Sequence, residues 1–293
     1  LVDHRRMTET FNNVPPRNVD PSMHMFEPAL GTAPGLGRMQ GRRVLVVGAG
    51  QRISAEDQPP VGNGRAITRV LAREGAEVVC LDVSQEAADL VRREIEAEGG
   101  RAHTLVADVM DVAAIAGLVE RSAQLMGGLD GLVLGVGVAG MNFADVTSED
   151  WDRSFAINVR SHMWFARAAL GIMDPGSSIV MLSSRAGMQP GSRMPAYDVT
   201  KAAQYQLSRS IAFEGEPKGI RCNCIIVGLI DTPMGRDEGR KKPQRAAKVP
   251  FGRQGTAWEV AYAALFLMSH ESSYVNAQSL VVDGGQYYGI IRN

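Results

Sequence analysis

From Arg43 onward the chain alternates short, β-branched apolar runs with longer amphipathic stretches. This alternation is typical of βαβ units, in which each helix returns the chain across a parallel sheet. Strands are expected at 44–47, 77–81, 103–106, 131–136, 178–182, 221–226 and 279–282. Helices are expected near 64–74, 85–98, 112–126, 150–172, 198–215 and 257–269. The pattern predicts a single α/β domain: a doubly wound parallel sheet of seven strands with helices on both faces and a ligand site at the strands' carboxyl ends.

Residues 1–40 differ from the rest of the chain. They carry five prolines and scattered glycines without a sustained period, which predicts an extended N-terminal arm. Residues 1–6 precede Met7 and are expected to be left over from expression, with Met7 as the natural start. Residues 41–293 are expected to form the sheet-containing domain. Whether the arm wraps a neighbouring surface or stays mobile is left open.

The charge balance and the cysteines exclude several classes of protein. The formal net charge of −1 offers no basic surface for nucleic acid or for an anionic membrane. Because no apolar run is long enough to span a bilayer and no signal core precedes the domain, we expect a cytoplasmic protein. Cys80, Cys222 and Cys224 lie in apolar runs without further metal ligands nearby, so we expect buried thiols and no metal site.

A glycine-rich loop with an insertion follows the first strand. Gly48-Ala49-Gly50 is separated from Val61-Gly62-Asn63-Gly64 by ten polar and proline-containing residues, 51–60. Without the insertion the string fits G-x-x-x-G-x-G, whose glycines let a diphosphate approach the backbone and the next helix's N-terminal amides. A glycine-rich surface loop is the alternative interpretation. We predict that a dinucleotide is bound by Gly48, Gly62, Asn63 and Gly64.

The next strand ends carry further candidate cofactor contacts. Asp82 ends the second strand, where a carboxylate can accept hydrogen bonds from the adenosine ribose and would repel a 2′-phosphate, which favours NAD over NADP. Asp82 could instead cap the next helix, and Arg52 could meet a 2′-phosphate. Asp108-Val109 follows the third strand, where the adenine edge would lie; a turn aspartate is the alternative. Gly135 lets the backbone pass the adenosine ribose.

Tyr197 and Lys201 lie four residues apart in a predicted helix, so the phenol and the ammonium share one face. A phenol that exchanges protons near pH 7 needs its pKa lowered by about 3 units, roughly 4 kcal/mol, and a unit charge about 4 Å away supplies about that much. Ser184 ends a strand-like run and could hydrogen-bond a substrate carbonyl. Asn158 could hold a water for proton relay. A loop-capping Ser184 and a packed Asn158 amide are the alternatives.

In this order the motifs resemble those of the short-chain dehydrogenase/reductase family over about residues 41–285. The resemblance continues through 221–223, 228–232, 251–253 and 281–285. It implies a Rossmann-type fold and a catalytic tetrad of Asn158, Ser184, Tyr197 and Lys201. It also implies that Tyr197 and Lys201 contact the cofactor, Lys201 through the nicotinamide ribose, and that Ile230 and Thr232 contact the carboxamide. Subunits of this family pair through the helices expected at 150–172 and 198–215, so a homo-oligomer, either a dimer or a homotetramer, is expected.

The activity expected from this resemblance is reversible conversion of an alcohol and a carbonyl compound. We expect an NAD(H)-dependent oxidoreductase of a small-molecule alcohol or ketone, with NADP a less favoured cofactor and Tyr197 as general acid/base. The spacing of Tyr197 and Lys201 argues against enoyl reduction, whose enzymes carry this pair farther apart. The alternative is a catalytically silent dinucleotide-binding sensor or scaffold. The interrupted glycine loop suggests it, as does Leu134-Gly135-Val136-Gly137 where the family has Asn-Asn-Ala-Gly.

Two further segments have a role that the motifs do not define, the insertion at 51–60 and residues 232–255. The insertion at 51–60 is expected over the cofactor rim or at a subunit contact, with Glu56 and Asp57 directed away from phosphate. Residues 232–255 correspond to the segment that covers the substrate. A solvated charge run and an acidic substrate are the two interpretations of six basic residues that it holds, which are Arg236, Arg240, Lys241, Lys242, Arg245 and Lys248.

Overall fold

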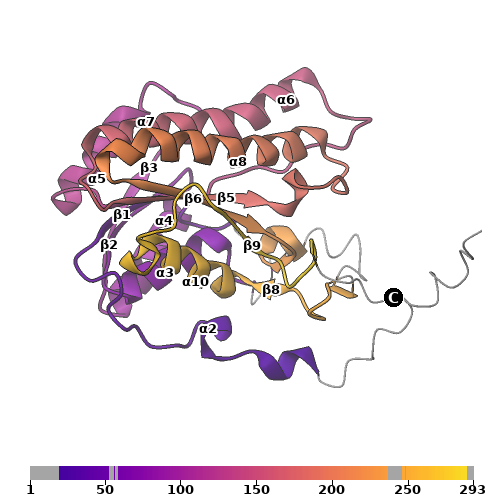
Figure 1. Cartoon of the computed structure of the whole chain (residues 1–293), viewed down its shortest axis with the longest axis horizontal. Coiled ribbons are helices and arrows are strands. Elements are labelled where there is room, and N and C mark those ends of the chain that lie inside the picture. Colours follow the sequence, from indigo (N-terminus) through magenta and orange to yellow (C-terminus); the bar gives the residue numbers. More distant parts are fainter. Residues whose placement is uncertain (1–19, 53–55, 57–58, 237–245, 248, 289–293) are drawn as a thin grey trace, which may run out of the picture.

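The computed structural model describes residues 20–52, 56, 59–236, 246, 247 and 249–288. A parallel sheet of seven strands, in the order β3-β2-β1-β4-β5-β6-β9, runs through its centre (Figure 1). The strands are β1 (Arg43–Val47), β2 (Glu77–Asp82), β3 (Arg101–Val106), β4 (Gly131–Leu134), β5 (Ser178–Ser184), β6 (Arg221–Val227) and β9 (Ser279–Val282). The predicted doubly wound, Rossmann-type fold in one domain is confirmed.

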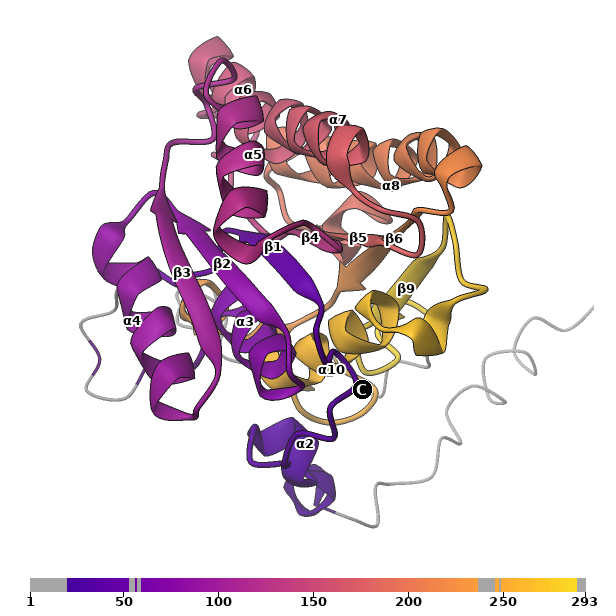
Figure 2. The ribbon, with the colours of Figure 1, turned by 90° about the vertical axis from the view of Figure 1, so that its left-hand side faces the viewer.

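Helices cover both faces of this sheet (Figure 2). One face carries α3 (Asn63–Arg73), α4 (Gln85–Ala97) and α10 (Ala257–Met268). The other carries α5 (Ile115–Met126), α7 (Ser161–Ile172) and α8 (Pro195–Gly215). No helix in the described part of the chain is both long enough and apolar enough to cross a membrane.

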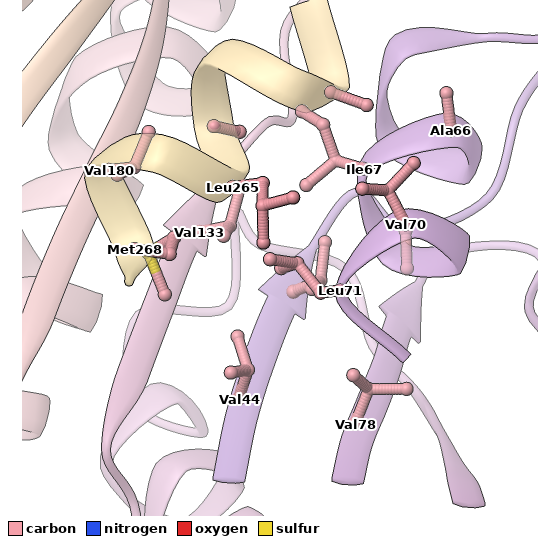
Figure 3. Close-up of a cluster of buried hydrophobic side chains, with 14 of the residues drawn as sticks. Val44, Ala66, Ile67, Val70, Leu71, Val78, Val133, Val180, Leu265 and Met268 are labelled. Atoms are coloured by element: carbon pink, nitrogen blue, oxygen red, sulfur yellow. The ribbon is translucent and has the colours of Figure 1, made fainter. Parts of the chain in front are cut away.

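The strands are apolar at successive positions because both of their faces are buried. In β1, Val44 and Val46 face the α3 and α10 side, whereas Leu45 and Val47 belong to the cluster under α5 and α7. Figure 3 shows Val44 below Leu71 and Leu265 in the first of these clusters. The free cysteines Cys80, Cys222 and Cys224 are buried in the same two cores, and burial raises the pKa of each thiol.

Several element boundaries differ from the sequence prediction. The expected helix at 150–172 consists of α6 (Ser148–Phe155), one π-helical turn, η2 (Ala156–Arg160), and α7. The predicted fourth strand ends at Leu134 rather than residue 136, because the chain leaves the sheet there to form the wall of a cavity. A small pair of strands, β7 (Ile230–Asp231) and β8 (Gly255–Thr256), was not predicted. This pairing brings together the two ends of the predicted substrate-covering segment.

The described part of the predicted N-terminal arm packs on its own domain. It contains two short helical turns, η1 (Pro21–His24) and α2 (Glu27–Leu30). The carbonyl of Ala29 accepts a hydrogen bond from Thr256 Oγ1 at 2.7 Å. The amides of Leu36 and Arg38 donate to the buried Glu74 carboxylate at 2.9 and 3.0 Å. These contacts hold the arm against α3 and the start of α10, on the side away from α7 and α8 (Figure 1).

Candidate active site

A cavity of about 1430 Å³ opens at the carboxyl ends of the central strands. Its wall is built from the ends of β1, β2, β4, β5 and β6 together with the starts of α3 and α8. The sheet therefore gathers side chains that are far apart in sequence. The predicted residues in the wall are Gly48, Gly62, Asn63, Gly64, Asp82, Gly135, Ser184, Tyr197, Lys201, Ile230 and Thr232.

The glycine loop brings the start of α3 against the end of β1. Gly48 has a φ of +81°, a left-handed conformation that favours glycine. A Cβ on Gly64 would lie 1.9 Å from the carbonyl oxygen of Gly48. Only a residue without a side chain permits this contact, so the amide end of α3 is held beside the cavity despite the insertion.

The described residues of the insertion make a contact that joins its two ends and a contact with Arg236. The side-chain oxygen of Gln51 accepts a hydrogen bond from the Gly62 amide at 2.8 Å, which joins the two ends of the insertion. Glu56 pairs with Arg236 at 2.7 Å, and Arg236 also pairs with Asp231 at 2.9 Å. Glu56 therefore contacts the start of the segment expected to cover the substrate. Asp57 lies outside the described residues.

The ion pairs of Arg236 also bear on the acidic-substrate interpretation. Hydrogen bonds that this guanidinium donates to the Asp231 and Glu56 carboxylates raise its pKa above the ordinary value. Arg236 is thus held by carboxylates of its own chain. Arg253, near the end of the segment, pairs with Glu259 at 2.7 Å. The remaining basic residues of the segment lie outside the described residues.

Asp82 lies at the end of β2 and supports the loops on both sides of it. Its carboxylate accepts hydrogen bonds from the amides of Gly50 and Ser84, at 3.0 and 3.1 Å. The N-cap of α4 is Ser84, whose hydroxyl oxygen accepts from the Ala87 amide at 3.2 Å. Asp82 is therefore not the helix cap, and it remains in the cavity wall.

Asp108 and Val109 lie apart from the described cavity wall. The Asp108 carboxylate accepts a hydrogen bond from the Met110 amide at 2.9 Å, as a turn aspartate does. Val109 is buried in the core under α5. Their contact with an adenine ring stays a prediction.

Ser184 and Tyr197 reach the cavity from β5 and α8, which are packed tightly together. A Cβ on Gly187, three residues after Ser184, would lie 2.4 Å from the Ala202 amide of α8. Ser183 Oγ donates to the Lys201 carbonyl at 2.7 Å. The Ser184 hydroxyl oxygen accepts from the Ala186 amide at 3.2 Å, so its own hydrogen is left to donate to a ligand.

Lys201 is a buried ammonium beside Tyr197. It is 6% exposed, and its Nζ lies 5.6 Å from the centre of the Tyr197 ring. Burial lowers the pKa of Lys201 from 10.5 to about 8. The ammonium donates to the Leu182 carbonyl at 3.0 Å and to Gln204 Oε1 at 3.1 Å. The buried Lys201 side chain thus lies beside the phenol ring, on the same side of α8, as the spacing predicted.

Asn158 is fully buried within the π-helical turn η2 and lies behind the described cavity wall. Its side-chain oxygen accepts from the Val138 amide at 2.9 Å. Its side-chain nitrogen donates to the Val138 carbonyl at 3.1 Å and to Thr200 Oγ1 at 3.0 Å. These hydrogen bonds fit the interpretation of Asn158 as a packed amide, and its part in proton relay stays a prediction. The amide fixes the segment after β4, where the supporting asparagines of the resembling family are missing.

Two site residues were missed by the sequence analysis. Gln204 accepts a hydrogen bond from Lys201, and its side-chain nitrogen lies 3.0 Å from Nδ1 of His162. The signal was present in the spacing, because Gln204 lies three residues after Lys201 and His162 four residues after Asn158. Neither residue belongs to the motifs that were used, so their contact across two helices was not predicted.

His162 should make the stability of the fold sensitive to acid. Burial lowers the pKa of His162 to about 3, with the Lys201 charge as a second cause. Below its ordinary pKa of 6.5, the unfolded chain binds a proton that the folded chain does not, so stability present above pH 6.5 is lost progressively down to about pH 3. By pH 5.5 this residue should lower the free energy of unfolding by about 1.4 kcal/mol.

Urea denaturation of His162→Gln at pH 7.5 and 5.5 tests this expectation. The variant should lose about 1.4 kcal/mol less between the two pH values than the wild type does. Ser208→Ala, which removes a buried hydrogen bond of α8 but no titrating group, should lose as much as the wild type. Equal losses in all three proteins would contradict the expectation.

Comparison with known proteins gives consistent matches. Residues 61–286 match the family described as enoyl-(acyl carrier protein) reductase. The chain is 37% identical over 262 residues to the uncharacterized oxidoreductase YghA of Escherichia coli K12, covering 87% of this chain and 86% of that protein. It is 35% identical over 257 residues to cyclopentanol dehydrogenase of Comamonas testosteroni, covering 85% and 98%.

A solved structure matches the fold as well as the sequence. It is a short-chain dehydrogenase from Burkholderia cenocepacia J2315 in complex with NADP. Its TM-score is 0.78 at 30% identity, and the match covers 85% of this chain and 99% of that one.

Proposed function

The chain belongs to the short-chain dehydrogenase/reductase family, and on that premise we propose that it interconverts alcohols and carbonyl compounds with NAD(H), using Tyr197 as general acid/base. The observation that carries the proposal is that Ser184, Tyr197 and Lys201 share one cavity wall with the glycine loop and Asp82. Groups for proton transfer and groups for a dinucleotide thus line the same space. The likeness to cyclopentanol dehydrogenase supports an alcohol as the substrate.

The residues present fit a nicotinamide dinucleotide. The glycines leave a bare backbone at the start of α3, and two buried polar atoms of the described wall, Asn63 Oδ1 and Gln286 Oε1, have no partner within the described chain. Gly48, Gly62, Asn63 and Gly64 would hold the diphosphate, and Asp82 the adenosine ribose. The remaining proposed contacts are Asp108, Val109 and Gly135 for the adenosine and Lys201, Ile230 and Thr232 for the nicotinamide half. When bound, the nicotinamide supplies or accepts the hydride.

Side chains of the protein would transfer the proton and hold the substrate oxygen. In the reductive direction the Tyr197 phenol donates a proton to the substrate oxygen, and in the oxidative direction the phenolate takes it back. Lys201 stabilises the phenolate because a buried ammonium lies beside the ring. Ser184 holds the substrate oxygen with its free hydroxyl hydrogen, which orients the carbonyl carbon toward the cofactor position.

An oligomer is also proposed. Trp151 of α6 and Val199 and Phe213 of α8 expose apolar surface along the helices through which the family pairs its subunits. Phe213 is 73% exposed and adds to this apolar surface. A homodimer or homotetramer would cover this face.

Tyr197→Phe tests the catalytic role. The variant should retain the NADH dissociation constant within about threefold and lose about 10²-fold to 10⁴-fold in kcat, because the general acid is removed. The measurement is turnover on secondary alcohols and ketones, including cyclopentanol and cyclopentanone, and on an enoyl thioester. Tyr262→Phe, on α10 beside Arg38, is the matched control and should behave as the wild type.

Three other results of these turnover measurements would contradict the proposal. Turnover of the enoyl thioester alone would favour enoyl reduction, the activity for which the matched family is named. NADH binding without turnover by the wild type would favour the silent sensor. Retained turnover of the alcohols in Tyr197→Phe would refute the role of the phenol.

Asp82→Asn tests the cofactor preference. Loss of the charge should lower kcat/KM for NADH about 10-fold to 100-fold, because hydrogen bonds to a charged group contribute roughly 1.5–3 kcal/mol. The ratio of NADPH to NADH efficiency should rise correspondingly. Asp89→Asn, a carboxylate of α4 outside the described cavity wall, is the control. A wild-type preference for NADPH would overturn the assignment and favour recognition of a 2′-phosphate by Arg52, which also lines the cavity.

Glu56→Gln tests the place that we propose for the insertion, over the cofactor rim. Arg236 is 40% exposed, so its pair with Glu56 is worth at most about 1 kcal/mol, and the NADH dissociation constant should rise about twofold to fivefold at low salt. The effect should fade as salt screens the charges. Glu96→Gln, which removes an exposed pair on α4, should leave the dissociation constant unchanged. The same constant in all three proteins would remove the insertion from the cofactor site.

A further inference from the structure

Behind Lys201 lies a buried hydrogen-bonded pair that the proposed mechanism has not used. Gln204 of α8 and His162 of α7 are both fully buried. Gln204 Oε1 accepts from Lys201 Nζ at 3.1 Å, and Gln204 Nε2 donates to the Asn158 carbonyl at 2.7 Å. The same nitrogen lies 3.0 Å from His162 Nδ1, and His162 Nε2 lies 3.2 Å from the Val136 carbonyl. The chain of contacts runs from the catalytic helix to the segment that leaves β4.

The chemistry of the partners fixes the orientation of both side chains. An ammonium only donates and a carbonyl only accepts, so the Gln204 oxygen must face Lys201 and its nitrogen must face Asn158. The amide nitrogen likewise only donates, so His162 Nδ1 must accept. The proton of the neutral imidazole is therefore on Nε2, where it donates to the Val136 carbonyl. Each group has one role, and no member can flip without breaking a buried hydrogen bond.

This arrangement determines where Lys201 points. Of its three N–H groups, one is taken by the Leu182 carbonyl and one by Gln204. The third is left for the cavity that Lys201 lines. Because the ammonium sits at the end of a flexible four-carbon chain, its direction depends on the two acceptors behind it.

We propose that Gln204 and His162 are positioning residues: the imidazole orients the Gln204 amide, and the amide holds the Lys201 ammonium toward the phenol and the cofactor ribose. This inference rests on the proposed function. Protonation of His162 would put a hydrogen on its Nδ1, which would then face the N–H of the Gln204 amide, and would add a second positive charge near Lys201. The charged or titrating groups that face the pair are Lys201 itself and the Cys224 thiol of β6, which burial keeps neutral.

Gln204→Leu is the main test, because leucine fills a similar volume without either end of the amide. We expect kcat to fall about 10-fold to 100-fold while KM for the alcohol stays within threefold, because lost orientation of a charged group costs turnover more than substrate binding. The alkaline limb of the kcat/KM profile should move to lower pH, because the ammonium loses an acceptor. Gln204→Glu, which restores an acceptor, should recover part of kcat and move that limb to higher pH.

The role of His162 is tested by a double-mutant cycle. His162→Leu should lower kcat in the wild-type background and have no further effect in Gln204→Leu, because the histidine acts only through the amide. Additive losses would refute the pairing. Ser208→Ala, one turn after Gln204 on α8, is the matched control, since it removes a buried hydrogen bond without contact to Lys201. It should lower Tm and leave kcat and its pH profile unchanged.

The outcomes separate this inference from the proposed function. If the wild type turns over alcohols and Gln204→Leu changes only Tm, the inference is wrong and the function stands. If the wild type turns over none of the substrates, the proposed function is wrong. The role of Gln204 and His162 is then tested by fluorescence titrations of NADH binding at several pH values. The pH at which NADH binding weakens should still be lower in Gln204→Leu, and an unchanged pH would refute the inference. If Gln204→Leu does not fold, Gln204→Asn, which shortens the reach and keeps both amide ends, takes its place with the same expectations.

Discussion

A buried ammonium is the constraint on which the site depends. Lys201 has lost nearly all contact with solvent, and a buried charge is tolerated only when fixed dipoles replace water. The Leu182 carbonyl of β5 and the Gln204 side chain of α8 provide these dipoles. Gln204 is held in turn by the Asn158 carbonyl of η2 and by His162 of α7. His162 also contacts the Val136 carbonyl, so hydrogen bonds connect Lys201 to η2, α7, α8 and the segment after β4.

The same network shows how the fold accommodates two departures from its family. The amide of Asn158 ties Val138 to α8 and so supplies the support that the sequence after β4 lacks. The insertion leaves the glycine loop intact for two reasons. The Gln51 side chain accepts a hydrogen bond from the Gly62 amide and so joins the two ends of the insertion, and Gly64 still packs against the Gly48 carbonyl. Neither departure removes a group from the cavity, which weakens the case for a silent binding protein.

The limits of sequence-based prediction follow from the range of the interactions. Strand and helix positions were predicted closely because apolar periodicity is local and both sheet faces are buried. The site motifs were predicted because parallel strands end at one edge, so residues that follow them meet. Asn158 was identified, but the hydrogen bonds of its amide were not predicted, because its partners Val138 and Thr200 lie 20 and 42 residues away. The pairing of β7 with β8 and the contact of Glu56 with Arg236 likewise depend on segments that meet only after folding.

The sequence by itself determined the doubly wound sheet, the glycine loop at the end of β1 and the tyrosine and lysine on one helical face, because each follows from spacing along the chain. The tertiary structure alone decided what surrounds the lysine. Gln204 and His162 come from different helices, and burial of both makes every hydrogen bond between them obligatory. No spacing rule connects positions 42 residues apart, so only the packing of α7 against α8 brings these two polar side chains together behind the buried Lys201.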